Sequence, residues 1–383
     1  MDALTTPLPK DWQRVRLGDI LSYEQPTKFL VTTTQYLQKG FTPILTAGKT
    51  FILGYTNDKH GIYTNIPVII FDDFTTDSKM VNFPFKVKSS AIKILSLRDN
   101  NQADLKYIYE KLTLLKHQVT DHKRYWIDEF SNFEILLPPL NEQSAIANIL
   151  SDLDHYLCAL DALILKKEGV KKSLSFELLS QRKRLKGFNQ AWQRVKVKDF
   201  GIIITGSTPL TQISEYWNGT ISWITPTDIN DNKDIFNSER KITQKGLNTI
   251  RMIPKNSVLV TCIASIGKNA ILRVNGACNQ QINAIIPNKD FNADFIYYLM
   301  ENNKQYLLGK AGVTATYIIS KQVFEEIDFF VPKDLNEQIA IANVLSDLDN
   351  EIASLKNKKR QFENIKKALN HDLMSAKIRV LNK

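Results

Sequence analysis

The chain has 383 residues, which is enough for two domains with separate cores, and 43% of its residues are hydrophobic, as in an ordinary globular protein. A net charge of +10 favours a polyanionic partner without requiring one. No apolar run is long enough to span a membrane, no signal peptide opens the chain, and the cysteines and histidines show neither disulfide nor zinc spacing. We therefore expect a cytoplasmic protein without a metal of its own.

The first predicted domain spans residues 1–140. Short apolar runs at 42–46, 67–71 and 90–95 lie between Gly, Asn and Asp turns and predict strands. The spacing of apolar residues then predicts a helix over 104–115. Two enzymatic patterns in this domain are incomplete. Residues 46–50 resemble the end of a nucleotide-binding loop but lack its first Gly, and Asp72-Asp73 is better explained as a polar turn than as a nuclease site.

A long helix is predicted over 141–186 and again over 336–383. The segments 141–185 and 336–380 carry the same residue at 20 of 45 aligned positions, so they form an internal repeat. Apolar residues recur at alternating steps of four and three, which is typical of a coiled-coil seam; two ordinary amphipathic core helices are the alternative. Asn141 and Asn336 are predicted as N-caps, and Gly187 as the residue that ends the first helix.

The second predicted domain spans residues 187–335 and repeats the frame of the first. Strands are predicted near 202–204, 221–224, 258–262 and 283–286, followed by a helix over 294–308. The Trp-Gln-Arg-Val run that begins at Trp12 returns at Trp192, with about fifteen extra residues later in the second copy. The predicted fold is α+β (mixed α/β): two globular domains separated by two long antiparallel coiled-coil helices, with an internal pseudo-two-fold repeat.

No complete catalytic motif is present, but both domains contain polar loops beside aromatic residues. Their side chains can hydrogen-bond base edges and phosphates. Any single loop is better explained as plain surface, but the recurrence of such loops in both halves favours a binding role for the set. The candidate DNA-binding residues are Thr46, Lys49, Lys59, His60, Thr75, Lys79, Lys123, Arg124, Ser207, Thr225, Thr227, Lys268, Gln280, Thr314, Tyr317 and Lys321. Apolar residues off the helical seam predict a partner-docking face, or contacts with the protein's own domains; they are Ile149, Leu163, Val344 and Ile365.

Over nearly its full length the chain resembles the DNA-specificity (S) subunit of type I restriction-modification systems. The resemblance is carried by the twin Leu-Asn-Glu-Gln-x-Ala-Ile-Ala-Asn helices that start at Leu140 and Leu335, and by Gly206-Ser207-Thr208-Pro209 with the Trp223–Ile229 segment. It implies a subunit without catalysis, in which each target-recognition domain reads one half of a split target in double-stranded DNA. It also implies methyltransferase (M) subunits that use S-adenosylmethionine and dock on the helices, and restriction/translocase (R) subunits that use ATP and Mg.

Two other functions are weighed against this one. A fused restriction or modification enzyme with an unrecognised catalytic site would need room that two readers and two helices do not leave. A coiled-coil adaptor without a DNA role would share the helices, and salt-dependent binding to duplex DNA would separate it from a specificity subunit.

Overall fold

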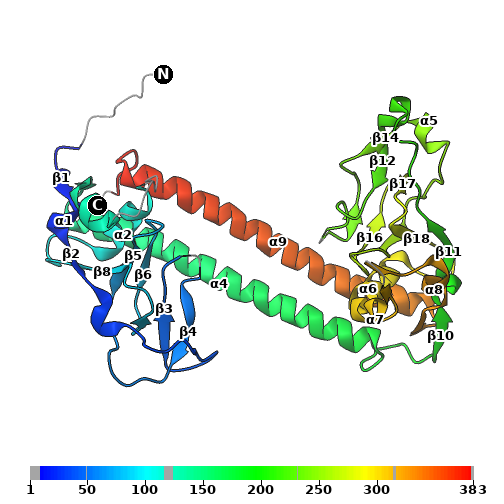
Figure 1. Cartoon of the computed structure of the whole chain (residues 1–383), viewed down its shortest axis with the longest axis horizontal. Coiled ribbons are helices and arrows are strands. Elements are labelled where there is room, and N and C mark those ends of the chain that lie inside the picture. The colour runs from blue at the N-terminus through cyan, green and yellow to red at the C-terminus, as the bar shows by residue number, and fades with distance from the viewer. Residues whose placement is uncertain (1–8, 49, 116–123, 231, 314–315, 381–383) are drawn as a thin grey trace. The chain divides into compact units, whose positions relative to one another are not determined.

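The computed structural model describes residues 9–48, 50–115, 124–230, 232–313 and 316–380 (Figure 1). Contacts divide the chain into two compact units: Met1–Asp161 with Asn357–Lys383 form unit 1, and Ala162–Lys356 form unit 2. Each unit therefore contains one globular domain, the N-terminal half of one long helix and the C-terminal half of the other.

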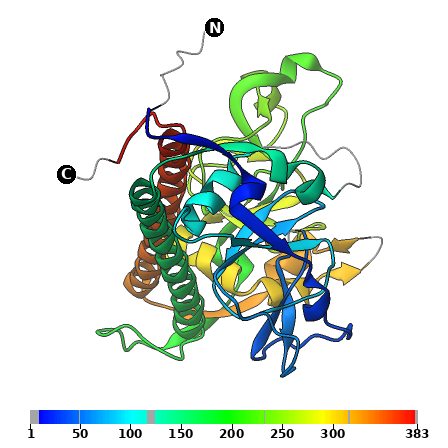
Figure 2. The ribbon, with the colours of Figure 1, turned by 90° about the vertical axis from the view of Figure 1, so that its left-hand side faces the viewer.

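Unit 1 contains three small sheets. A four-stranded sheet has the order β2 (Leu21–Glu24), β8 (Ile92–Leu97), β5 (Val68–Asp72), β6 (Ser78–Val81), and a three-stranded sheet has the order β4 (Ile52–Thr56), β3 (Thr42–Leu45), β7 (Lys86–Val87). β1 (Gln13–Arg16) pairs with β9 (Glu134–Leu137) just before the first long helix. The short helices are α1 (Leu17–Ile20), η1 (Pro26–Phe29), α2 (Leu105–Thr113), α3 (Tyr125–Asp128) and η2 (Phe130–Asn132). Figure 2 views the molecule from the side of this unit.

The three strands and the helix predicted in the first domain are confirmed. β5 is buried along its whole length, which explains its continuous apolar run, and it lies between β8 and β6. The helix α2 begins after Asp104, whose carboxylate accepts hydrogen bonds from the backbone N–H groups of Lys106 and Tyr107. This side chain supplies two of the partners that the first turn of a helix lacks.

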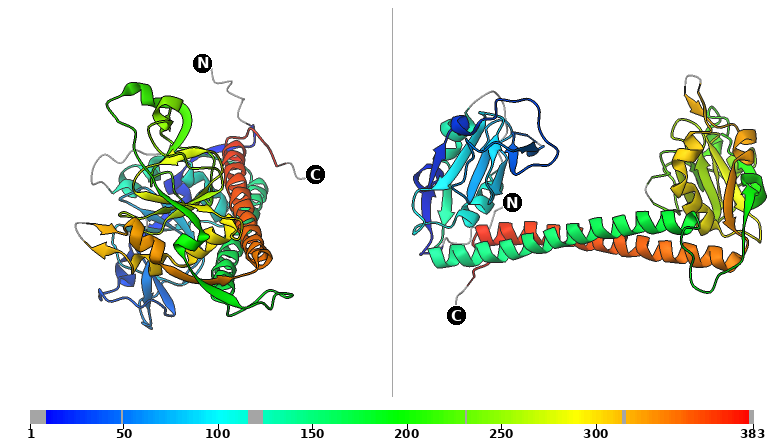
Figure 3. Two further views of the ribbon diagram at one scale, coloured as in Figure 1. Left: turned by 90° about the vertical axis from the view of Figure 1, so that its right-hand side faces the viewer. Right: turned by 90° about the horizontal axis from the view of Figure 1, so that it is seen from below.

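Unit 2 repeats this plan. Its five-stranded sheet has the order β11 (Gly201–Thr205), β18 (Ile282–Pro287), β15 (Ser257–Thr261), β16 (Asn269–Leu272), β13 (Asp234–Ile235); its three-stranded sheet has the order β14 (Lys241–Ile242), β12 (Trp217–Ile224), β17 (Gly276–Cys278). β10 (Trp192–Lys196) pairs with β21 (Asp328–Pro332) as β1 pairs with β9. Figure 3, left, views the molecule from the side of this unit.

The second unit also carries elements that have no counterpart in the described part of the first. These are β13, η4 (Ser214–Tyr216), α5 (Gln244–Leu247) and the hairpin of β19 (Gly312–Val313) and β20 (Tyr317–Ile318); η3 (Val197–Phe200) and α8 (Lys321–Glu326) complete the unit. The four predicted strands are confirmed. The predicted helix over 294–308 is wrong in one respect, because it is two helices, α6 (Ala293–Asn302) and α7 (Lys304–Leu308). Asn303 breaks it by turning its amide to the backbone oxygen of Leu299, 2.8 Å away.

The two long helices are α4 (Leu140–Leu179) and α9 (Leu335–Met374), each 40 residues long. Their predicted N-caps are wrong, since each helix begins one residue before the Asn. In α9 the capping carboxylate belongs to Asp334, which accepts the N–H of Asn336 at 2.9 Å. Gly187 does not end the first helix either. α4 ends at Leu179, and Gln181 with a φ of 60° makes the left-handed turn that Ala376, with a φ of 59°, makes after α9.

The halves of the two helices pair antiparallel within each unit, as predicted. In unit 1 the rings of Tyr156 and Phe362 lie 4.6 Å apart, and Lys359 pairs with Asp161 at 2.6 Å. In unit 2 Lys167 pairs with Glu351 at 2.8 Å, and Lys356 pairs with Glu168 at 2.6 Å. Each contact joins the first half of one helix to the second half of the other. The apolar residues that predict the seam are all buried or half-buried; they are Ile146, Leu150, Leu153, Leu157, Leu160 and Ile164 in α4, and Ile341, Leu345, Leu348, Ile352, Leu355, Phe362 and Leu369 in α9.

The repeated Asn-Glu-Gln motif holds each domain to its helices. Glu337, 1% exposed, accepts the Trp192 indole N–H at 3.2 Å and pairs with Arg184 at 2.6 Å. Glu142 makes the same contacts with Trp12 and Arg379 in unit 1. The neighbouring glutamines, Gln143 and Gln338, are fully buried, and each accepts the backbone N–H of the residue that caps the domain helix, Asp104 or Asn292.

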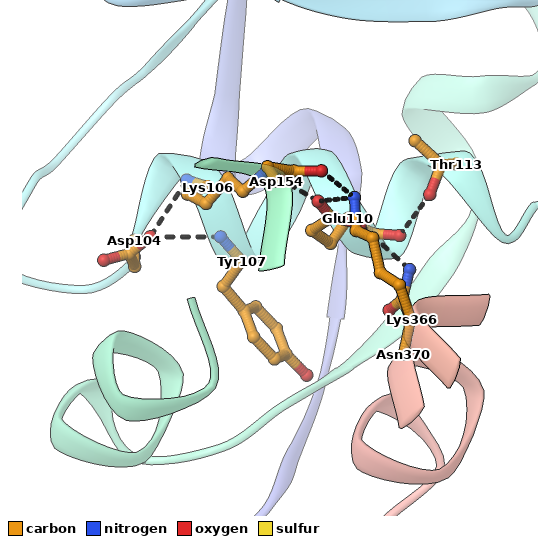
Figure 4. Close-up of polar contacts among 8 residues, drawn as sticks. All are labelled: Asp104, Lys106, Tyr107, Glu110, Thr113, Asp154, Lys366 and Asn370. Atoms are coloured by element: carbon orange, nitrogen blue, oxygen red, sulfur yellow. Dashed lines mark hydrogen bonds and ion pairs between the residues drawn. The ribbon is translucent and has the colours of Figure 1, made fainter. Parts of the chain in front are cut away.

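Further along the helices of unit 1, a polar cluster joins α2 to both of them (Figure 4). Glu110 on α2 is 2% exposed; it lies 2.6 Å from Lys106 and 3.3 Å from Lys366 and accepts the Asn370 amide at 2.9 Å. Asp154 on α4 pairs with the same two lysines at 2.6 and 2.5 Å. The two lysines thus offset two carboxylates that come from different helices, which is what partly buried charges require.

Lys111 joins α2 to the end of α9. Its ammonium donates to the backbone oxygen of Met374 at 2.6 Å, at the C-terminal end of α9 where a positive charge is favoured. Burial lowers the pKa of Lys111 to about 8. The last turn of α9 is therefore fixed to the first domain by a lysine in an unusually dry environment.

Candidate nucleic-acid interface

In unit 2 the predicted loops meet at one edge of the sheets. Backbone hydrogen bonds link them in series: Ser207 N–H to the oxygen of Cys278, Asn279 N–H to Ile224, Cys262 N–H to Gln281, and Ile319 N–H to Cys262. Segments near 207, 225, 262, 280 and 318, far apart in the sequence, thus form one continuous surface. This edge is formed by the strands β11, β18 and β15, which neighbour one another in that order, and by the pair β12 and β17.

Two small hydrogen-bonded groups are held on this edge. The hydroxyls of Thr225 and Thr227 lie 2.7 Å apart, and Asp228 accepts both the Thr225 hydroxyl and its N–H. Thr208 donates to the amide oxygen of Gln280 at 2.6 Å. Thr225 is half-buried, and Thr227 and Gln280 are exposed, so these side chains have fixed positions while retaining hydrogen-bonding capacity toward a partner.

The other predicted residues of this domain have different settings. The Ser207 hydroxyl is buried and has no hydrogen-bond partner among the described residues, while its backbone oxygen accepts the Trp223 indole N–H at 3.0 Å. Lys268 is exposed in the loop after β15, and Tyr317 is 48% exposed on the hairpin joined to that loop by a hydrogen bond from Ala264 N–H. Lys321 is exposed at the start of α8 and pairs with Glu325 at 3.4 Å. Thr314 lies outside the described residues.

In unit 1 the predicted residues Thr46 and Thr75 lie around Asp72. This buried carboxylate accepts Gly48 N–H at 2.7 Å and the Thr75 hydroxyl at 2.8 Å, so it ties the loop after β3 to the turn after β5. Lys79 lies over the Phe51 ring at 4.5 Å, in the strand beside that turn. The structure thus brings three predicted residues, Thr46, Thr75 and Lys79, to one place. Lys49, which follows Gly48, lies outside the described residues.

Asp73 is buried as well, and its role is structural. It pairs with Lys93 at 2.8 Å and accepts the Trp126 N–H at 3.0 Å, which places the start of α3 beside the turn after β5. Arg124, two residues before Trp126, is exposed and pairs with Asp128 at 3.3 Å. Lys123 lies outside the described residues. As the sequence predicted, Asp72 and Asp73 build a polar turn.

Lys59 and His60 occupy a separate loop after β4. Both are exposed, and the backbone oxygen of His60 accepts the Lys86 ammonium at 3.1 Å, which also pairs with Asp58 at 2.8 Å. Lys86 belongs to β7, the strand parallel to β3. This loop is therefore fixed to the sheet from which Thr46 emerges.

One residue that sequence reasoning missed is Arg240. It is exposed, and its guanidinium carbon lies 4.2 Å from the Trp217 ring and 4.8 Å from the Trp223 ring. Two tryptophans six residues apart, followed by a basic pair, were the available signal, but only the pairing of β12 with β14 brings them together.

The predicted docking residues fall into two groups. Ile149 and Val344 are half-buried and pack against the core of their own unit, which was the alternative weighed for them. Leu163 and Ile365 are 38% and 50% exposed. Leu165, beside Leu163, is 71% exposed.

Three further observations bear on chemistry. Among the described residues, no helix is long and apolar enough to cross a membrane, and no three His, Cys, Asp or Glu side chains gather as metal ligands would. Burial raises the pKa of the Cys262 and Cys278 thiols to about 12, so neither is a nucleophile at neutral pH.

Comparison with known proteins agrees with a mixed α/β domain that occurs twice in the chain. The type I restriction modification DNA specificity domain matches residues 9–167 and again residues 189–364. The EcoR124I/EcoR124II specificity subunit of Escherichia coli is 36% identical over 355 residues, which cover 87% of this chain and 85% of that protein. The MjaIX specificity subunit of Methanocaldococcus jannaschii is 36% identical over 182 residues, 46% of this chain and 41% of that protein.

The fold agrees with a solved structure. The S subunit of the type I restriction-modification system from M. genitalium superposes with a TM-score of 0.65 over 96% of this chain and 98% of that one, at 15% identity. The chain belongs to the type I restriction-modification DNA specificity family, and it is a specificity subunit of such a system.

Proposed function

We propose that each globular domain reads one half of a bipartite DNA target in the major groove, and that the protein performs no catalysis of its own. The observation that carries this proposal is that one frame occurs twice with different loops on it. The order of the strands that the two units share, the Trp–Glu–Arg contact and the buried glutamine are the same in both, whereas unit 2 adds β13 and the edge loops differ in length and sequence. A constant frame with two different polar edges suits the reading of two different sequences.

The helices supply the second part of the proposal. They set the length of the unread spacer between the half-sites and dock the methyltransferase subunits, which bind S-adenosylmethionine and modify adenine. Leu163, Leu165 and Ile365 are exposed apolar residues on these helices, which supports docking there. Restriction/translocase subunits that use ATP and Mg would complete a cytoplasmic complex.

The decisive experiment is to express this chain with its cognate methyltransferase in a host without DNA methylation, and to map methylated adenines by long-read sequencing. We expect two short half-sites across a gap of constant length. Methylation at one short continuous site would show that only one domain reads DNA. The absence of methylation, with both proteins soluble and associated, would favour the adaptor.

A further inference from the structure

A pocket of about 580 Å³ lies beside the candidate interface of unit 2, and none of the candidate DNA-binding residues lines it. It is formed where β12 and β14 meet the segment before η4, and its lining residues include Thr211, Ser214, Asn218, Arg240 and Lys241. The single acidic side chain in its wall is Glu239, which is exposed. A hollow lined by two cations, two hydroxyls and an amide has the composition of an anion site.

The pocket and the candidate interface share a tryptophan. The Trp223 indole N–H is bonded to the backbone oxygen of Ser207, at the interface, while its ring contacts Arg240, in the pocket wall. The chain itself runs from Ser207 to Thr211 in four residues, and the Trp217 indole N–H fixes this segment by donating to the oxygen of Leu210 at 3.2 Å. The two sites are therefore neighbours within unit 2.

Arg240 is held in place without being neutralised. The Trp217 and Trp223 rings, which meet edge to face at 5.1 Å, each contact its guanidinium. Neither Arg240 nor Lys241 forms an ion pair with any residue that the structure describes. Nearby Lys245, by contrast, pairs with Glu215 at 2.7 Å. A guanidinium fixed by stacking keeps its N–H edge free for a bidentate acceptor and loses little entropy on binding.

We propose that this pocket binds a backbone phosphate of the DNA duplex next to the half-site read by the second domain, with Arg240 and Lys241 as the cations and Thr211 and Ser214 as hydroxyl donors. This inference rests on the proposed DNA-reading function and adds to it a positioning contact. Lys241 suits a phosphate, because a lysine ammonium is a point charge that binds phosphate well. Such a contact fixes the register of the domain on the duplex without reading sequence.

The test uses the full chain in complex with its methyltransferase and two duplexes, one that carries the mapped target and one with that target scrambled. Binding is measured over a series of KCl concentrations. Removal of one phosphate contact by Arg240→Ala should weaken binding to both duplexes and reduce the slope of log K against log[KCl] by about 0.9. Arg240→Lys should keep most of the slope, because it keeps the charge.

Lys245→Ala is the matched control. It also removes one positive charge from unit 2, but from a residue that is already paired with Glu215. It should leave the salt slope unchanged, and thermal unfolding will show whether each variant is folded. An unchanged salt slope for a folded Arg240→Ala complex would overturn the proposal. A loss of specificity at a single base pair with an unchanged slope would also overturn it, because Arg240 would then contact a base. If the unaltered complex binds neither duplex, the proposed function itself fails.

Discussion

Glu337 is a buried carboxylate held by two residues from other elements. Its partner Arg184 lies beyond the end of α4, and Trp192 lies on β10. Glu337→Gln keeps an acceptor for the indole but leaves Arg184 without its counter-charge. We expect a loss of about 2 to 3 kcal/mol in the free energy of unfolding, measured with urea.

The control for this change is Glu215→Gln, which breaks a pair with Lys245 that is exposed on both sides. Exposed pairs contribute little because water and salt screen them, so the free energy of unfolding of Glu215→Gln should stay close to that of the native protein. Equal losses in the two variants would show that burial does not increase the contribution of the Glu337–Arg184 pair to the free energy of unfolding.

A second residue-scale prediction concerns the basic pair Lys123 and Arg124. If both side chains contact phosphates, replacing them together with Ala should flatten the salt dependence of DNA binding by the complex. Each phosphate contact that is lost means that fewer counterions are released from the DNA on binding. Arg124 is exposed, and its pair with Asp128 at 3.3 Å is weak. An unaltered slope would remove both residues from the DNA-binding surface.

At the scale of elements, the contact between α2 and the end of α9 should depend on pH. The pKa of Lys111 is about 8 in the folded protein, below its ordinary value of 10.5. Between these values the unfolded chain holds the proton and the folded chain does not, so stability rises with pH in this window. Relative to Lys111→Met, the native protein should gain about 1 kcal/mol per pH unit above pH 8.

This prediction is checked by urea unfolding of both proteins at several pH values from 7 to about 10. Lys28→Met is the control, because Lys28 is exposed and removing it should leave the pH dependence of the native protein in place. If the native protein and Lys111→Met change in parallel across the window, the buried lysine is not the source of the effect.

The ends of the long helices offer a stabilising change. Gln181 and Ala376 both adopt a positive φ, at 60° and 59°, where a side chain is disfavoured and glycine is not. Gln181→Gly and Ala376→Gly should each raise the free energy of unfolding by about 0.5 to 1 kcal/mol, again by urea unfolding. Glycine at Ser173, an exposed position inside α4, should instead lower stability. The same sign at all three positions would contradict the helix ends described above.

Periodicity explains which elements could be predicted from the sequence. The buried strands and the helical seam depend on spacing along the chain, and they are found where the apolar pattern places them. The predicted start of α9 is wrong because Asp334, one residue before the helix, caps it in place of Asn336, and backbone geometry decides between the two. The role of Glu337 and the position of Arg240 depend on Trp192, Trp217 and Trp223 from other strands, and no local pattern contains that information.

At the scale of the whole molecule, the proposal that the long helices set the spacer length can be tested by lengthening one of them. Four residues add about 6 Å to a helix, close to the rise of two base pairs. Inserting them into one long helix should lengthen the unread spacer in the methylation map and leave both half-sites unchanged. Altered half-sites with an unaltered spacer would contradict the proposal that the helices set the length of the spacer.

The division of unit 1 into two distant segments also determines the order in which the protein can be completed during synthesis. Asp154, Glu142 and Lys111 emerge from the ribosome early, but their partners Lys366, Arg379 and Met374 follow only after all of unit 2. The unit whose synthesis begins first is thus the last to receive all its residues. A chain that ends at Lys356 would contain every residue of unit 2, but unit 1 would lack its second segment, Asn357–Lys383.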